Sequence, residues 1–359
     1  MENQVKFANW WSKLLFEKSF ENQFVIPLPN PKPIQALLKS IEKRKFGKKI
    51  EAELATIKID RPVFIVGLPR SGTSLLYNLL AAHEDAAYCT NAMNSFTETI
   101  CAIEWLRKKF KLNVRGERFL EDSVEVDFGT PSEPAMFWGK WIGRDAHNLK
   151  WKEKTLADFS PEKLAEIQQD LKKILYTFGG NGKRFITKYP IFQTELRMIN
   201  ALFPDAHFIH IVRDGRMTAN SLIKLYNLCN RQIQKIKHPD LNSIVPYPRV
   251  PKLETYLKEY GPTDLRCTAH VWEDSIDVVD AVKNDLHRFT QVRYEDLLAN
   301  PKVELQKLFD FIGLKWPNPA HTEFAKEFSL IGKVHHTNQY VGYDIVEKEV
   351  GGTLKRLGY

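Results

Sequence analysis

The chain has 359 residues, 43% of them hydrophobic and 27% charged, which is the composition of a folded globular protein and not of a disordered one. Its net charge of +8 suits an anionic ligand, a nucleic acid or an anionic membrane surface, without choosing among them. Four cysteines, with no C-x-x-C pair and no zinc-ligand spacing, argue against a disulfide framework and favour a reducing compartment.

Residues 1–57 are predicted to form a helical extension that packs on the domain that follows. Lys6, Lys13, Glu17 and Lys18 interrupt the apolar residues of the first twenty positions, which therefore lack the pattern of a signal peptide. No stretch approaches the length of a membrane span. We expect a cytoplasmic protein whose aromatic, basic N-terminal helix is a candidate for peripheral contact with a membrane.

Short apolar strands alternate with helices from residue 63 onward. The expected pairs are a strand at 63–66 with a helix at 73–82, a strand at 184–187 ending at Lys188 with a helix at 193–202, a strand at 207–212 with a helix after Asp214, and a strand at 289–293 with a helix after Glu295. This alternation predicts an α/β fold whose parallel sheet is buried on both faces.

The expected architecture has three α/β/α layers with a central parallel sheet and helical additions, and the glycine-rich loop that follows the first strand, at residues 67–74, makes it a P-loop nucleotide-binding fold. Residues 58–359 are predicted to form one domain. Two stretches interrupt the alternation, near 85–160 and 227–262. We expect these insertions to form the acceptor side of the site, where a second substrate would bind.

A glycine-rich loop follows the first strand, with the sequence Gly67-Leu68-Pro69-Arg70-Ser71-Gly72-Thr73-Ser74. Its glycines allow a tight turn, and the helix that follows contributes N–H donors and a positive dipole end, so the loop is suited to a phosphate-like group. It departs from the motif G-x-x-x-x-G-K-[ST], because Thr73 stands where that motif has lysine. Arg70 supplies a cation inside the loop instead, which could stabilise charge on a leaving phosphate oxygen without a metal.

A second basic turn, Arg213-Asp214-Gly215-Arg216, ends the strand at 207–212, and Ser221 lies in the helix after it. An arginine at a strand end and a serine one to two helical turns later can converge on one anion.

The segment LPRSGTSLLYNLLAAHED resembles the 5′-phosphosulfate loop of sulfotransferases, in the P-R-S-G-T branch that includes tyrosylprotein sulfotransferases and a related bacterial group. The pattern R-D-G-R…S resembles the 3′-phosphate motif of the same family. The resemblance implies 3′-phosphoadenosine 5′-phosphosulfate (PAPS) as co-substrate, with no metal. It makes Arg70 the catalytic cation, and assigns the 5′-phosphosulfate to Ser71, Gly72, Thr73 and Ser74 and the 3′-phosphate to Arg213 and Ser221.

Three further segments take roles from this resemblance. Lys188, in a K-x-P segment, would lie beside the transferred sulfuryl oxygens, and Tyr294, in a Y-E-[DQ]-L segment, would contact the nucleotide. Ser329 and Lys333 would belong to a loop that closes over the nucleotide.

The sequence marks the general base, which takes the proton of the acceptor hydroxyl, less clearly than it marks the anion sites. Tyrosylprotein sulfotransferases place a glutamate where an ungapped alignment puts Asn91, and an amide cannot take a proton. Glu133, in a P-x-E segment, is our first candidate and Glu98 the second. His83 and His147 are further alternatives, although His83 falls in a helix end better explained by structure.

Two other functions compete with sulfuryl transfer. One is a P-loop kinase or phosphotransferase using ATP and Mg²⁺, which the missing lysine argues against. The other is a non-catalytic nucleotide-binding protein. Nucleic-acid binding is not expected, because no stripe of basic and aromatic residues accompanies the net charge. The acceptor could be a small molecule, a carbohydrate, a lipid or a peptide.

Overall fold

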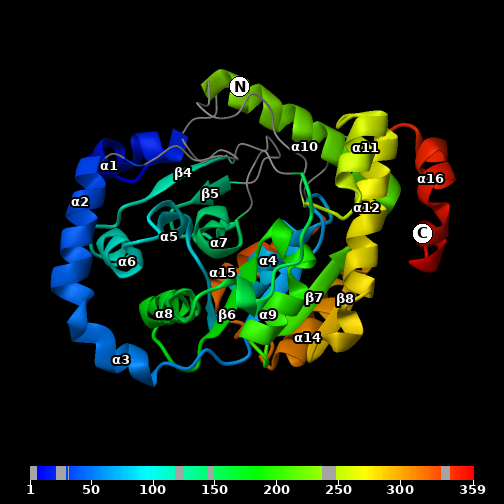
Figure 1. The fold of residues 1–359 in the computed structure, drawn as a ribbon. Coiled ribbons are helices and arrows are strands. Elements are labelled where there is room, and N and C mark those ends of the chain that lie inside the picture. The colour runs from blue at the N-terminus through cyan, green and yellow to red at the C-terminus, as the bar shows by residue number, and fades with distance from the viewer. Residues whose placement is uncertain are drawn as a thin grey trace. The chain divides into compact units, whose positions relative to one another are not determined.

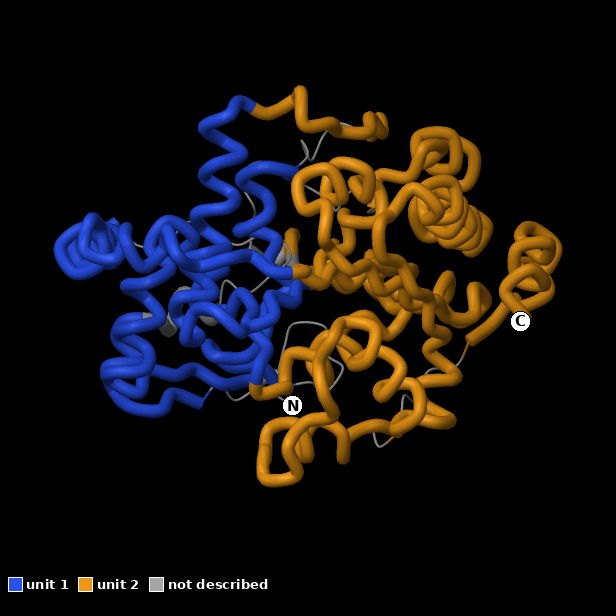
Figure 2. The backbone as a smooth tube through the Cα atoms, turned by 90° about the horizontal axis from the view of Figure 1, so that it is seen from below, with its two compact units in different colours: residues 1–60, 85–143, 160–187 blue, residues 61–84, 144–159, 188–359 orange. Residues whose placement is uncertain are grey.

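The structure is a computed structural model of the chain, and it describes residues 6–21, 30, 32–117, 125–143, 149–236, 248–332 and 340–359. The chain divides into two compact units, which Figure 2 distinguishes by colour. Unit 1 comprises residues 1–60, 85–143 and 160–187, and unit 2 comprises residues 61–84, 144–159 and 188–359. The division at residue 57 and the acceptor role of residues 85–160 and 227–262 stay predictions.

Unit 2 contains three parallel strands in the order β2 (Val63–Val66), β7 (His207–Val212) and β8 (Arg288–Arg293). Every side chain of β2 and β7 is buried, as expected of strands covered on both faces. Val66 pairs with His210, so the two strands end near one another at the same edge of the sheet. This register brings the glycine-rich loop and the second basic turn to one edge.

Helices flank these strands (Figure 1). They are α4 (Thr73–Ala81), α9 (Leu196–Leu202), α10 (Gly215–Ile236), α11 (Leu253–Tyr260), α12 (Leu265–Asp280), α13 (Tyr294–Ala299), α14 (Pro301–Ile312), α15 (Thr322–Ser329) and α16 (Tyr343–Arg356). Short 3₁₀ turns lie at Leu156–Asp158, Pro190–Thr194 and Lys283–Asp285. Phe64 anchors the core of the unit, with its ring centroid 5.3 Å from that of Phe192 and 5.7 Å from those of Phe203 and Phe208.

Unit 1 combines helices with two small groups of strands. Its helices are α1 (Trp10–Glu21), α2 (Lys32–Ile41), α3 (Glu51–Thr56), α5 (Asn91–Ser95), α6 (Ile100–Lys109), α7 (Ala135–Ile142) and α8 (Pro161–Thr177). Antiparallel strands β1 (Lys6–Phe7), β4 (Val114–Glu117) and β5 (Glu125–Asp127) form one group, and β3 (Ala86–Ala87) pairs in parallel with β6 (Arg184–Lys188). Buried Trp138 donates from its indole to Thr187 Oγ1 at 3.0 Å.

The α/β class with a central parallel sheet is confirmed, as are the strands predicted at 63–66, 184–188, 207–212 and 289–293. The helix predicted at 193–202 is confirmed over Leu196–Leu202, whereas its predicted start at residue 193 is wrong. Pro190 opens a 3₁₀ turn instead, and Glu195, at φ −129° and ψ 18°, interrupts the backbone before α9 begins. Within the predicted helical extension, the basic stretch after residue 41 forms a π-helical turn, Glu42–Phe46, and then a 3₁₀ turn, Lys48–Ile50.

His210, in the middle of the sheet, makes the stability of the fold depend on pH. Its ring is buried and hydrogen-bonded to Gln291 Oε1 at 3.2 Å, and burial lowers its pKa from 6.5 to about 4. Below pH 6.5 the unfolded chain therefore binds a proton that the folded chain excludes, so the free energy of unfolding falls as the pH falls. We expect His210 to account for a loss of roughly 2 kcal/mol between about pH 7.5 and about pH 5.

Urea unfolding of the wild type and of His210→Gln at both pH values measures this contribution. The variant should lose that part of the pH dependence, whereas His287→Gln, at an exposed histidine, should retain it. Identical pH dependence in all three proteins would contradict the assignment to His210.

Candidate active site

The glycine-rich loop between β2 and α4 is built around two glycines that cannot be replaced without a clash. Gly67 has φ +154° and Gly72 has φ +90°, angles that side chains disfavour. A Cβ at Gly67 would lie 2.6 Å from the Ile211 carbonyl oxygen, and one at Gly72 would lie 2.2 Å from Tyr294 Cδ2. The loop therefore lies directly against the end of β7 and the ring that follows β8.

Arg70 lies at the turn of this loop with φ +75°, a left-handed conformation that costs free energy in a residue other than glycine. The chain then enters α4 at Thr73, and both Ser71 and Thr73 are buried. The first N–H groups of α4 and its positive dipole end adjoin the loop, an arrangement suited to an anion.

The second basic turn contacts the loop through Arg213. This buried guanidinium donates from Nη1 to the carbonyl oxygen of Arg70 at 3.0 Å. Arg70 in turn donates from Nε to Ser221 Oγ, in α10, at 2.9 Å. The Arg213 guanidinium lies 4.8 Å from the centroid of the Tyr294 ring. Four residues predicted from three separate motifs thus form one cluster.

Lys188 joins the same loop from the end of β6. Its side chain is buried, and Nζ lies 3.5 Å from Ser74 Oγ in the first turn of α4. The loop therefore has two cationic side chains, Arg70 within it and Lys188 beside it.

The cluster fits an anionic group. Arg213 Nε is buried, and no hydrogen-bond partner for it occurs within the described part of the chain. A buried cation without a counter-charge is unfavourable, and an anion at the site would supply one. Burial also raises the pKa of the Tyr294 hydroxyl, although Arg213 and Arg70 lower it, so the hydroxyl stays protonated and able to donate near neutral pH.

Two side chains that hold the second basic turn were not predicted. Trp272, in α12, donates from Nε1 to the Arg213 carbonyl oxygen at 3.1 Å, and its ring covers Gly215, where a Cβ would lie 2.8 Å from it. Glu295 accepts from the Asp214 N–H at 3.1 Å and from the Tyr359 hydroxyl at 2.9 Å. Trp272 carries no motif signal, whereas Glu295 directly follows Tyr294 in the Y-E-[DQ]-L segment.

Two further candidates, Ser329 and His83, contact backbone carbonyl oxygens. Ser329 is exposed at the end of α15, and its hydroxyl donates to the Lys326 carbonyl oxygen at 2.8 Å. Lys333 lies outside the described residues, as does His147. Buried His83 contacts the Lys315 carbonyl oxygen at 3.0 Å, which fits a structural role.

Both candidate general bases belong to unit 1. Glu133 is exposed where α7 begins, and Glu98 is exposed before α6, with its carboxylate 2.5 Å from Lys39 Nζ. Asn91, whose amide cannot take a proton, donates from Nδ2 to the Asp127 carbonyl oxygen at 2.8 Å. This bond gives Asn91 a structural role in unit 1.

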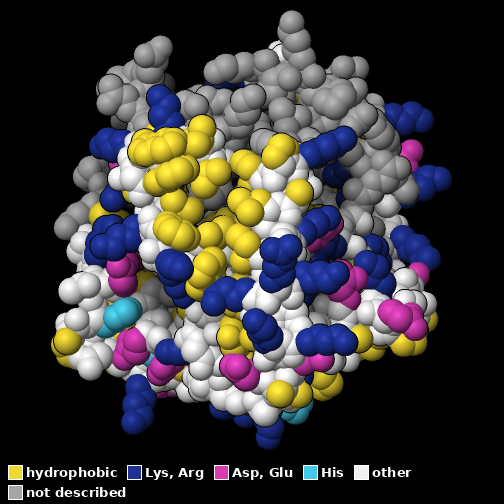
Figure 3. All heavy atoms as spheres, turned by 90° about the vertical axis from the view of Figure 1, so that its left-hand side faces the viewer, with side chains coloured by type: hydrophobic (Ala, Val, Ile, Leu, Met, Phe, Trp, Pro, Cys, Tyr) yellow, Lys and Arg dark blue, Asp and Glu magenta, His cyan; other side chains and the backbone are white. Residues whose placement is uncertain are grey.

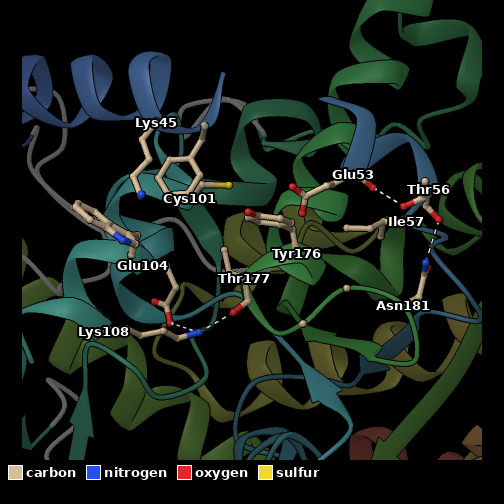
Figure 4. Close-up of a pocket in the computed structure, with 14 residues that line it drawn as sticks. Lys45, Glu53, Thr56, Ile57, Cys101, Glu104, Lys108, Tyr176, Thr177 and Asn181 are labelled. Carbon is tan, nitrogen blue, oxygen red and sulfur yellow. Dashed lines mark hydrogen bonds and ion pairs between the residues drawn. The ribbon is translucent and has the colours of Figure 1, made fainter. Parts of the chain in front are cut away.

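Unit 1 also contains a cavity of about 780 Å³ (Figure 4). Lys45, Glu53, Lys108 and Tyr176 are among its lining residues, and Lys108 is held by the Thr177 carbonyl oxygen at 2.6 Å. No residue of the glycine-rich loop or of the second basic turn lines it, so it is distinct from the anion cluster.

Sequence and structure comparisons show which known proteins the chain resembles. A sequence model described as the sulfotransferase family matches residues 62–318. An omega-hydroxy-beta-dihydromenaquinone-9 sulfotransferase of Mycobacterium bovis is 25% identical over 334 residues, which cover 89% of this chain and 79% of that protein. A protein-tyrosine sulfotransferase of Drosophila melanogaster is 24% identical over 270 residues, covering 74% and 41% of the two chains.

A solved sulfotransferase structure from Mycobacterium avium shares the fold. Its TM-score is 0.53 at 15% identity, with coverage of 94% of this chain and 88% of that one. A second, from Mycobacterium tuberculosis, has a TM-score of 0.51 at 16% identity and covers 89% and 82%.

The chain therefore belongs to the sulfotransferase family. It is an enzyme that transfers a sulfuryl group from PAPS.

The contact between Gly72 and Tyr294 leads to a prediction. In Gly72→Ala the added Cβ displaces the Tyr294 ring, so we expect binding of 3′-phosphoadenosine 5′-phosphate to weaken by about tenfold or more, from about 1–3 kcal/mol of overpacking. Calorimetric titration gives the dissociation constant. Gly182→Ala is a matched control, because Gly182 has φ +91° but no heavy atom within 4 Å of the position that a Cβ would take. The control should keep the wild-type affinity, and wild-type affinity in Gly72→Ala would show that Tyr294 does not shape the loop.

Proposed function

We propose that the chain transfers the sulfuryl group of PAPS directly to an acceptor hydroxyl, or alternatively an amine, by in-line displacement. Arg70 and Lys188 act as the catalytic cations, Ser71 to Ser74 hold the 5′-phosphosulfate, and Arg213 and Ser221 hold the 3′-phosphate, with Tyr294 against the nucleotide. The observation that carries this proposal is the pair of hydrogen bonds from Arg213 to the Arg70 carbonyl oxygen and from Arg70 to Ser221. They join two anion motifs in one cluster, as a donor with two anionic groups requires.

In this reaction the residues of the cluster position the donor and stabilise the charge that develops on the leaving phosphate. The bond from the acceptor oxygen to sulfur forms while the bond from sulfur to the 5′-phosphate oxygen breaks, and that phosphate gains the negative charge. Arg70 and Lys188 offset the charge as it develops, which we propose happens without a metal. The acceptor proton passes to a general base, for which we propose Glu133, with Glu98 as the alternative. A contribution of Ser329 and Lys333 to closing the site is part of the same proposal.

Phosphoryl transfer from ATP is the weaker alternative. Thr73 stands where a P-loop kinase has the lysine that reaches the β- and γ-phosphates, and it is buried at the start of α4.

For the acceptor we propose a hydroxyl on a lipid-like small molecule. The mycobacterial relative named for a menaquinone is similar over 79% of its length, whereas the protein-tyrosine relative is similar over 41% of its own. A lipid acceptor also fits the membrane contact that we propose for the N-terminal helix. Nucleic acid is not among the proposed partners.

The roles of Arg70 and Arg213 can be separated. In Arg70→Ala the backbone acceptor for Arg213 remains, so we expect nucleotide binding to stay measurable while kcat falls about 10²- to 10³-fold. In Arg213→Ala a charge-assisted contact is lost, and the affinity for 3′-phosphoadenosine 5′-phosphate should fall by about 10- to 100-fold. Calorimetry without metal, with ATP and Mg²⁺ in parallel, and a labelled-donor transfer assay give both quantities.

Arg61→Ala is a matched control for these variants, because Arg61 also has a left-handed backbone, at φ +45°, but is exposed before β2. It should keep wild-type affinity and rate. Turnover at the wild-type rate in both Arg70→Ala and Arg213→Ala, or binding of ATP in place of the bisphosphate, would contradict the assignment.

The general base is tested by Glu133→Gln and Glu98→Gln, each the control for the other. The glutamine amide keeps the size of the side chain but cannot accept the proton, so the true base should lose about 10²- to 10⁴-fold in kcat. Nucleotide affinity should remain unchanged in both. If both variants keep the wild-type rate, neither glutamate is the base.

A further inference from the structure

An apolar surface lies on the first two helices of unit 1. Trp10, Trp11 and Leu14 of α1 and Leu37 of α2 are each more than half exposed, and the two indole rings stack with their centroids 4.0 Å apart. We name these four residues the apolar patch. Figure 3 shows hydrophobic side chains gathered over this face of the molecule. Large exposed apolar side chains that cluster in this way mark an interaction surface.

Exposed cations occur on the elements that carry the apolar patch and on the turns that follow α2. On α1 and the strand before it they are Lys6 and Lys13, and from α2 to the 3₁₀ turn at Lys48–Ile50 they are Lys32, Lys39, Lys43, Arg44, Lys45, Lys48 and Lys49. In Figure 3, Lys and Arg side chains lie around the hydrophobic area. The region thus combines apolar and positively charged groups on one side of unit 1.

The one acidic residue among described residues 6–15 and 32–50 points away from this surface. The Glu42 carboxylate accepts from the Ala102 N–H at 2.6 Å, in α6, and burial raises its pKa despite that bond. The cations between Lys32 and Lys49 therefore have no exposed carboxylate within their own stretch of chain, although exposed Glu51 and Glu53 follow in α3 and Lys39 pairs with Glu98.

We propose that this surface binds the face of an anionic lipid bilayer. Tryptophan rings favour the boundary between headgroups and acyl chains, and lysine and arginine are attracted to anionic headgroups. A second copy of the chain fits less well, because a two-fold contact would place these cations opposite the same cations. No described helix combines the length and apolar character of a membrane span.

This inference rests on the membrane contact and the lipid acceptor proposed above. What is new is the set of residues that form the contact surface and the negative charge of the lipid that it binds. A bilayer bound at this surface would bring the enzyme to the phase in which a lipid acceptor is dissolved.

Cosedimentation of the full chain with phosphatidylcholine vesicles, with and without phosphatidylglycerol, tests the proposal. We expect binding only to the anionic vesicles, weakening as salt is added. Lys43→Glu/Arg44→Glu/Lys48→Glu should reduce the partition coefficient by about 100-fold or more, as expected for three surface cations. Lys258→Glu/Lys302→Glu/Lys355→Glu changes the net charge equally at exposed lysines of unit 2 and should bind like the wild type.

Trp10→Ala/Trp11→Ala tests the apolar contribution and should weaken binding by at least about tenfold, since two exposed indoles are removed. Titration of each variant with 3′-phosphoadenosine 5′-phosphate should give the wild-type affinity, which separates failure at the membrane from failure at the active site. Equal binding to neutral vesicles, or equal loss in the unit 2 control, would overturn the proposal. Self-association abolished by Trp10→Ala/Trp11→Ala would assign the surface to a second copy instead.

Discussion

The bond from the Arg213 guanidinium to the Arg70 carbonyl oxygen is the interaction on which the rest of the site depends. It requires the parallel register of β2 and β7, which ends both strands at one edge, and it requires glycines at 67 and 72 so that the loop can lie close to Ile211 and Tyr294. With this bond in place, the Arg70 side chain reaches Ser221, and the two anion motifs form one cluster.

The acidic residues beside this cluster are neutralised locally, which preserves its positive character. Asp214 is held by the Arg216 guanidinium, with a closest distance of 2.7 Å, and Arg216 also contacts Glu347 of α16 at 2.6 Å. Glu295 is occupied by the Asp214 N–H and the Tyr359 hydroxyl. Each carboxylate therefore stabilises the turn without competing for the guanidinium of Arg213.

The parts of the site that sequence could predict are those encoded locally. An apolar run followed by glycines predicts β2 and its loop, and an arginine at the end of an apolar strand predicts the second turn. Trp272 could not be found this way, because its bond to Arg213 spans 59 residues and depends on how α12 packs. The interruption at Glu195 was missed because helical periodicity continues across it, although Pro190 marks the start of the 3₁₀ turn.

The buried Arg213 Nε has a consequence for the lifetime of the protein. A guanidinium removed from water without a full set of partners lowers the stability of the empty fold, and a bound anion restores it by mass action. The fraction of molecules that unfold, and so become substrates for proteases, then depends on the supply of donor nucleotide.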